Sequence, residues 1–132
     1  NNYEGQKRLS ATVDPGFASL VRELRERGRL DRTLVIWMGE FGRTPRINGQ
    51  AGRDHYPRAF SVALAGGGIK GGQVIGSTNA TGTDIDKRPV TVPDLFCSIY
   101  EALKINPRRQ NQGNGRPIRL VEGGTPVKEL FA

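Results

Sequence analysis

The sequence has little cysteine and no long apolar run. Its 132 residues include a single cysteine, Cys97, so no disulfide can form within the chain. Cys97 lies in an apolar stretch with helical spacing, and we interpret it as a buried core residue. No apolar run approaches the roughly 18 residues of a membrane-spanning helix, and the start of the chain lacks the pattern of a signal peptide. These absences exclude a disulfide-stapled scaffold and argue against a membrane partner.

Aromatic and acidic residues are also scarce. Aromatic residues make up 7% of the chain, and 20 Lys and Arg face 13 Asp and Glu, which gives a net charge of +7. A basic chain suggests a nucleic-acid partner. However, both halves of the chain carry the excess of basic residues, and aromatic residues do not alternate with them as a base-stacking surface requires. The pattern disfavours nucleic acid, and an anionic small substrate accounts for the charge as well.

The length and the glycine content bound the fold. A chain of this length fits one domain, and we assign residues 1–132 to it. Eighteen glycines imply many loops and tight turns. The polar start has no initiator methionine, which leads us to expect a piece of a longer protein.

Two segments have the periodicity of amphipathic helices. In residues 14–28, apolar residues recur at i, i+3, i+4 and i+7, with Asp14 placed to cap the helix and a glycine to end it. Residues 91–105 repeat this spacing, and Thr91 and Asp94 at its start predict a capping box.

Apolar runs at 33–39 and 59–68 have the length of strands, and 71–78 is a shorter candidate. A continuous apolar run indicates a strand buried on both faces, which is typical of a parallel sheet. A helix followed by such a strand is half of a βαβ unit. Residues 117–131 predict a hairpin that turns at Gly123–Gly124. We therefore predict an α/β fold, a partial three-layer α/β/α sandwich with a mostly parallel sheet and a small C-terminal β hairpin.

A long polar loop at residues 40–57 carries the candidate chemistry. Glu40 directly follows the first predicted strand, and ligands of open α/β sheets bind beyond the carboxyl ends of the strands. Asp54 and His55 are adjacent, and a carboxylate with an imidazole suits zinc, manganese or iron. His55 is also a candidate general acid. We therefore take the loop as a candidate metal or catalytic site.

Each of these residues also has a structural interpretation. Glu40 can cap or ion-pair within a turn, and His55 can hold backbone groups of the loop. Arg43 and Arg53 can bind phosphate or sulfate through their forked guanidinium groups, or they can pair with Asp54 or Glu40. No serine–histidine–aspartate arrangement is evident in the sequence.

Four motifs follow one another in the order "LVIWMGEFGRTP", "GRDHYP", "LAGGGIKGGQVIGST" and "VTVPDLFCSIYEALKI". Together they resemble the C-terminal part of a sulfatase-related bacterial family, domain of unknown function fifteen-oh-one, within the alkaline phosphatase superfamily. The resemblance covers nearly the whole chain. It implies a metal-dependent hydrolase of sulfate or phosphate esters with an α/β/α fold, a divalent metal ion as cofactor, and export of the intact protein.

The resemblance also implies roles for individual residues. Glu40 stands where relatives have a metal-binding aspartate, and Phe41 stands where they have a metal-binding histidine. His55 matches a further metal-binding histidine, with Asp54 as a ligand or an orienting neighbour. Because Phe41 cannot bind a metal, the resemblance predicts an incomplete metal site.

The same resemblance places the nucleophile and its partner aspartate upstream of the chain. We therefore expect a fragment that does not turn over substrate alone, in which Arg43 and Arg53 hold the anionic ester. Two alternatives remain open, namely a non-catalytic binding or scaffold domain on a degenerate sulfatase fold and a basic nucleic-acid-binding domain. Missing strands would leave apolar sheet edges exposed, so we also expect self-association.

Overall fold

Residues 2–131 fold into two α-helices and four antiparallel strand pairs. The computed structural model describes residues 2–131, so the two terminal residues of the predicted domain lie outside the described part. In chain order the elements are α1 (Asn2–Glu26), η1 (Leu30–Arg32), β1 (Val35–Trp37), β2 (Gly42–Arg43), β3 (His55–Tyr56), β4 (Ala63–Ala65), β5 (Ser77–Thr78), β6 (Ile85–Lys87), α2 (Val92–Ala102), β7 (Gln110–Gly113), β8 (Arg116–Arg119) and η2 (Lys128–Leu130).

Helix α1 begins twelve residues before the predicted start at Asp14 and carries Pro15 in its interior. The predicted start is wrong because residues 4–11 are rich in Glu, Gln, Lys, Arg, Leu and Ala, which favour a helix strongly enough to extend it past the proline. The predicted end is confirmed. Gly28 has a left-handed φ of 63°, and its N–H and that of Arg29 bond back into the last turn of the helix, as in a Schellman motif.

Strands β1 and β4 run antiparallel, with Ile36 opposite Leu64 at the centre of the pair. The other pairs, β2–β3, β5–β6 and β7–β8, are antiparallel as well. The prediction of a three-layer sandwich with a mostly parallel sheet is therefore wrong. An apolar run indicates burial but not the direction of the neighbouring strand, and the long connection at residues 38–62 permits either direction.

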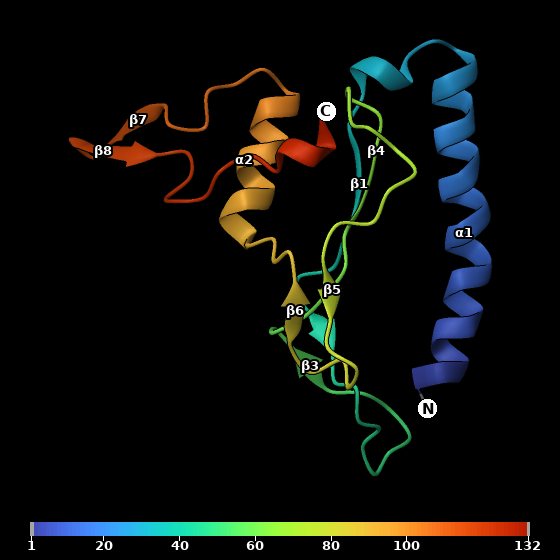
Figure 1. Cartoon of the computed structure of the whole chain (residues 1–132). Coiled ribbons are helices and arrows are strands. Elements are labelled where there is room, and N and C mark those ends of the chain that lie inside the picture. Colours follow the sequence, from blue (N-terminus) through green and yellow to red (C-terminus); the bar gives the residue numbers. More distant parts are fainter. Residues whose placement is uncertain (1, 132) are drawn as a thin grey trace.

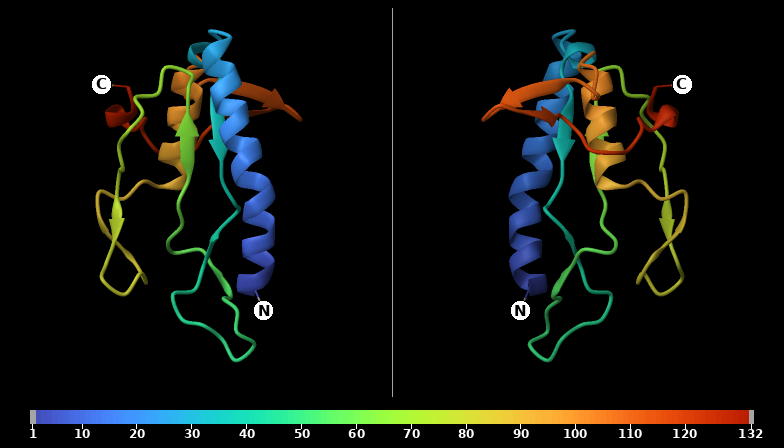
Figure 2. Two further views of the ribbon diagram at one scale, coloured as in Figure 1. Left: turned by 90° about the vertical axis from the view of Figure 1, so that its right-hand side faces the viewer. Right: turned by 90° about the vertical axis from the view of Figure 1, so that its left-hand side faces the viewer.

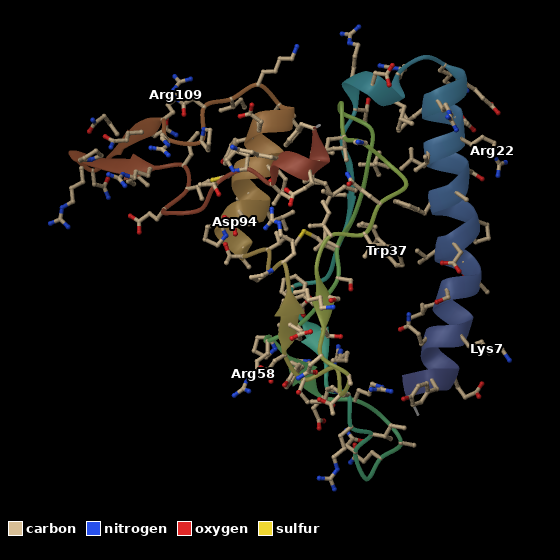
Figure 3. All side chains as sticks on the ribbon, in the orientation of Figure 1. Lys7, Arg22, Trp37, Arg58, Asp94 and Arg109 are labelled. Carbon is tan, nitrogen blue, oxygen red and sulfur yellow. The ribbon has the colours of Figure 1, made fainter. Side chains whose placement is uncertain are left out.

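Helices α1 and α2 lie on opposite sides of the β1–β4 pair in Figure 1, and the side views in Figure 2 agree. Trp37 points from β1 toward α1 in Figure 3, and its ring centroid lies 5.8 Å from that of Phe17. This ring contact joins the apolar stripe of α1 to the strand pair.

The buried side chains gather between α2 and the C-terminal segment, where Leu95, Cys97, Ser98 and Val127 are buried. Burial of Cys97 confirms the interpretation of its apolar surroundings. The predicted capping box of α2 is also confirmed, because Asp94 N–H donates to the Thr91 hydroxyl and the Asp94 carboxylate accepts from Thr91 N–H. The helix ends at Ala102, three residues before the predicted end.

The hairpin predicted at residues 117–131 is wrong in position, because the hairpin of the structure is formed by β7 and β8. Its two turn residues, Asn114 and Gly115, both have positive φ, at 49° and 74°, as a tight two-residue hairpin turn requires. Gly124, which the prediction placed in the turn, instead packs against the backbone of Pro93.

The surface of the chain is large for its mass. The described structure exposes 10105 Å², whereas a compact monomer of 14.4 kDa exposes roughly 6,800 Å². Several large apolar side chains contribute to the excess, among them Trp37 at 53% and Val74 at 93% exposed. No described helix is both long and apolar enough to cross a membrane.

Candidate functional site

The candidate site is built on the β2–β3 pair, which structures the ends of the loop at residues 40–57. Arg43 lies directly opposite His55 in this pair, so the two side chains emerge on the same face. Behind the ladder, Thr44 N–H donates to the Asp54 carbonyl over 3.0 Å, and Asp54 N–H donates to the Thr44 hydroxyl over 3.1 Å. These bonds continue the pairing by one residue into the loop.

Asn48 organises the tip of the loop. Its side-chain oxygen accepts hydrogen bonds from Gln50 N–H at 3.0 Å and Gly52 N–H at 3.1 Å. Its side-chain NH₂ group donates to a carboxylate oxygen of Asp54 over 2.8 Å. The loop is therefore ordered by its own polar groups, and one face of the Asp54 carboxylate is held by an amide.

Arg53 ties the loop to α1. Its Nη1 donates to the carbonyl oxygens of Thr44 and Pro45, and its Nε donates to the Tyr3 hydroxyl over 2.8 Å. The guanidinium carbon also lies 5.9 Å from the centroid of the Tyr3 ring. These contacts give Arg53 a structural role in the loop, and its predicted role in holding an anion stays a prediction.

His55 and Arg43 are exposed on the outside of the ladder. The imidazole ring packs on Phe41, with ring centroids 4.2 Å apart and planes tilted by 43°. The Arg43 guanidinium makes one long hydrogen bond, 3.5 Å to the carbonyl oxygen of Arg53. Glu40 is exposed as well. The face of the ladder thus offers an imidazole and a guanidinium side by side.

Glu40, Asp54 and His55 do not by themselves form a metal centre. Within residues 2–131, no three His, Cys, Asp or Glu side chains are grouped closely enough to hold a metal ion. His55 turns toward Phe41 while Asp54 turns toward Asn48, as adjacent residues of an extended chain do. A metal bound at His55 would need ligands from outside this part of the chain.

Two residues that anchor the loop were not predicted. The Tyr56 hydroxyl donates to the Thr83 carbonyl over 2.6 Å and fixes β3 to the turn before β6. Asn48 orders the tip of the loop through three hydrogen bonds of its side chain. The "NGQ" pattern that begins with Asn48 is a signal for a local side-chain turn, whereas the sequence contains no signal for the contact between Tyr56 and Thr83.

Comparison with known proteins gives one match. The family model described as "Protein of unknown function (DUF1501)" matches residues 1–131. No curated protein and no solved structure matches the chain. The matched region includes the whole loop with β2 and β3, so the candidate site lies inside the family region.

Proposed function

Because the chain belongs to the family of proteins of unknown function DUF1501, which assigns no activity, we propose a function from the site itself: the chain is part of a metal-dependent hydrolase of sulfate or phosphate esters. One observation carries the proposal. A loop ordered by its own hydrogen bonds presents the exposed His55 imidazole directly opposite the exposed Arg43 guanidinium. A nitrogen ligand beside an anion-binding group suits metal-assisted cleavage of an anionic ester.

Each residue of the site has a defined part in this proposal. In this proposal His55 and Glu40 are metal ligands, and Asp54, whose carboxylate faces the Asn48 amide, orients the loop that carries His55. Arg43 holds the charged oxygens of the ester. When bound, the divalent metal ion polarises the ester. In this proposal the nucleophile and the remaining metal ligands come from outside this chain.

The test compares three variants of the intact protein, His55→Ala, Arg43→Ala and Arg22→Ala. Arg22 lies on the exposed side of α1 in Figure 3 and serves as a charge-matched control for Arg43. We expect His55→Ala to lose bound metal and hydrolysis of p-nitrophenyl sulfate or phosphate. Arg43→Ala should keep the metal and raise KM. Unchanged metal content and unchanged hydrolysis in His55→Ala would overturn the proposal.

A second candidate function is a non-catalytic scaffold, and the contact between Phe41 and His55 favours it. The 4.2 Å ring separation gives His55 a packing role that needs no metal. His55→Leu separates the two functions, because leucine keeps an apolar group against Phe41 but cannot bind a metal. If the protein is a scaffold, His55→Leu should keep the melting temperature, and the protein without the substitution should contain no metal. If it is a hydrolase, His55→Leu should lose both the bound metal and the activity.

A further inference from the structure

The positive charge of the chain is concentrated on the β7–β8 hairpin and its approach. Residues 104–119 contain no Asp or Glu and five basic residues, so this segment holds five of the seven net positive charges: Lys104, Arg108, Arg109, Arg116 and Arg119. The hairpin projects away from the two helices in Figures 1 and 2, and Figure 3 places Arg109 at its base.

A cavity of about 310 Å³ lies between this basic segment and α2. Cys97 of α2 lines one side, and Arg108, Gln110 and Arg119 line the other. The strand register brings Gln110 and Arg119 to the same cavity. The two residues lie directly opposite each other in the hairpin, and opposite residues share a face of the sheet. Arg108, Gln110 and Arg119 therefore border the same opening.

Neither Arg108 nor Arg119 pairs with a carboxylate of the described residues. Among residues 2–131, the Arg108 and Arg119 side chains form no hydrogen bond or ion pair. Elsewhere, three arginines do pair with carboxylates, namely Arg27 with Glu23, Arg58 with Asp84, and Arg88 with Glu129. Two cations that share one opening repel each other, and an anion between them removes that repulsion.

Cys97, which lines the cavity, interacts electrostatically with Arg108. Burial raises the pKa of the Cys97 thiol, and Arg108 acts in the opposite direction on the same pKa. The Arg108 guanidinium is therefore within electrostatic reach of the cavity wall.

We propose that this cavity binds the phosphate or sulfate group of a small anionic ligand, held between Arg108 and Arg119 with the Gln110 side-chain amide as a neutral donor. The forked donors of arginine match the oxygens of either group. The volume lies at the lower end of ligand sites, which suits an anionic group with a small substituent. The hairpin and the loop at residues 40–57 lie at opposite ends of the molecule in Figure 1, so this site is independent of the proposed hydrolase.

The composition of the hairpin favours a small ligand over nucleic acid. Residues 104–119 contain no Phe, Tyr or Trp, so the hairpin has no platform on which a base can stack. The two arginines that line the cavity converge on one opening, whereas Arg116 sits three residues from Arg119 and therefore on the opposite face of the strand.

The test is calorimetric titration of the full chain with inorganic phosphate and, separately, inorganic sulfate at low ionic strength. Arg108→Gln and Arg119→Gln are compared with Arg116→Gln, which changes the net charge by the same amount. Loss of a hydrogen bond to a charged group predicts about tenfold weaker binding in the first two variants, and little change in Arg116→Gln. The anion that binds with the higher affinity shows whether the site prefers a phosphate or a sulfate group.

Modification of Cys97 by a thiol reagent gives a second, independent measurement. Phosphate or sulfate should slow the modification of Cys97 in the original sequence, and about tenfold more anion should be needed for the same slowing in Arg119→Gln. Equal weakening by all three arginine variants would show diffuse charge rather than a site and would overturn the proposal. So would the absence of saturable binding of both anions, or binding of duplex DNA with a steep salt dependence to which all five basic residues contribute equally.

Discussion

The Ser98 hydroxyl accepts a hydrogen bond from the backbone N–H of Val127 across 2.8 Å. The two residues are only 1% and 2% exposed. Ser98 donates at the same time to the Asp94 carbonyl of the preceding turn, at 2.7 Å. One hydroxyl thus joins α2 to the C-terminal segment inside the small buried region.

Replacing Ser98 with alanine should lower the free energy of unfolding by about 1–3 kcal/mol, because the Val127 N–H is left buried without an acceptor. Urea denaturation measures the loss. Ser61→Ala is the matched control, since Ser61 is exposed, and its effect should stay within about 0.5 kcal/mol. Equal effects in the two variants would contradict the role given to Ser98.

Gly42→Ala should destabilise the base of the candidate site. A Cβ atom at Gly42 would overlap the backbone carbonyl oxygen of Ala59, which can move only by shifting β2 or its neighbour. We expect a loss of about 1–3 kcal/mol, as for overpacking in a filled core. Gly49→Ala in the same loop meets open space and should leave the melting temperature nearly unchanged. Two equal melting temperatures would count against the close approach.

Asn48→Ala should loosen the tip of the loop without unfolding the chain. The substitution removes the acceptor for Gln50 N–H and Gly52 N–H and the donor to Asp54. Amide hydrogen exchange of residues 49–54 should become faster, while exchange in α2 stays unchanged. Gln50→Ala is the control, because only the backbone of Gln50 takes part in this network. Unchanged exchange in Asn48→Ala would show that the loop is ordered by other contacts.

Stability should depend on pH through Glu129. Two hydrogen bonds from Arg88, at 2.6 and 2.8 Å, lower the pKa of Glu129 from 4.5 to about 2. A carboxylate with a lowered pKa in the folded state stabilises the protein above its unfolded pKa, and this contribution is lost as pH falls from about 4.5 toward 2. Because the pair is exposed, we expect a small amplitude.

Glu129→Gln should therefore flatten the pH dependence of the urea midpoint between pH 5 and pH 2. Part of the pH dependence should remain, because the pKa of Asp94 is lowered as well. The Asp94 carboxylate accepts a hydrogen bond from the Thr91 hydroxyl, and further ones from the backbone N–H groups of Thr125 and Thr91. Glu122→Gln, at an exposed carboxylate outside the ion pairs, is the control. Identical pH profiles for Glu129→Gln and the unmodified chain would contradict the assignment.

Self-association through the sheet edges stays a prediction, and the β1–β4 pair provides the strand edges at which it is expected. Strands β1 and β4 each have a single partner among the described residues, so each leaves one edge open to another strand. Sedimentation velocity should show larger species as concentration rises. Ala63→Lys places a charge at the exposed first residue of β4 and should reduce the amount of these larger species. Ala80→Lys, in an exposed turn, should leave their amount unchanged. A concentration-independent monomer with a narrow thermal transition would exclude this association.

Local features of the fold could be predicted from the sequence, and non-local ones could not. The capping box at Thr91 and the left-handed Gly28 depend on neighbours within a few residues, and both were predicted correctly. The direction of β4 relative to β1 depends on how a long connection folds back, which the apolar pattern does not contain. The hairpin prediction is wrong because it takes Gly123–Gly124 as the turn, whereas the turn of the structure is formed by Asn114 and Gly115.

In the candidate site, too, local features could be predicted from the sequence and non-local contacts could not. The loop and its polar residues could be found from their position after an apolar strand, and β2–β3 pairing then placed Arg43 opposite His55. The hydrogen bond between Arg53 and Tyr3 joins residues 50 positions apart, and no local pattern indicates it. The roles of these residues in metal or anion binding remain predictions.

The large exposed area of the native chain also sets how it should respond to denaturant and heat. An unfolded chain of this mass exposes roughly 21,000 Å², so unfolding from 10105 Å² uncovers only about three-quarters of the area that a compact protein of equal mass would. The urea slope m and the heat-capacity change both scale with that area. A shallow urea transition and a small heat-capacity change would therefore reflect the shape of the native state and would not require a folding intermediate.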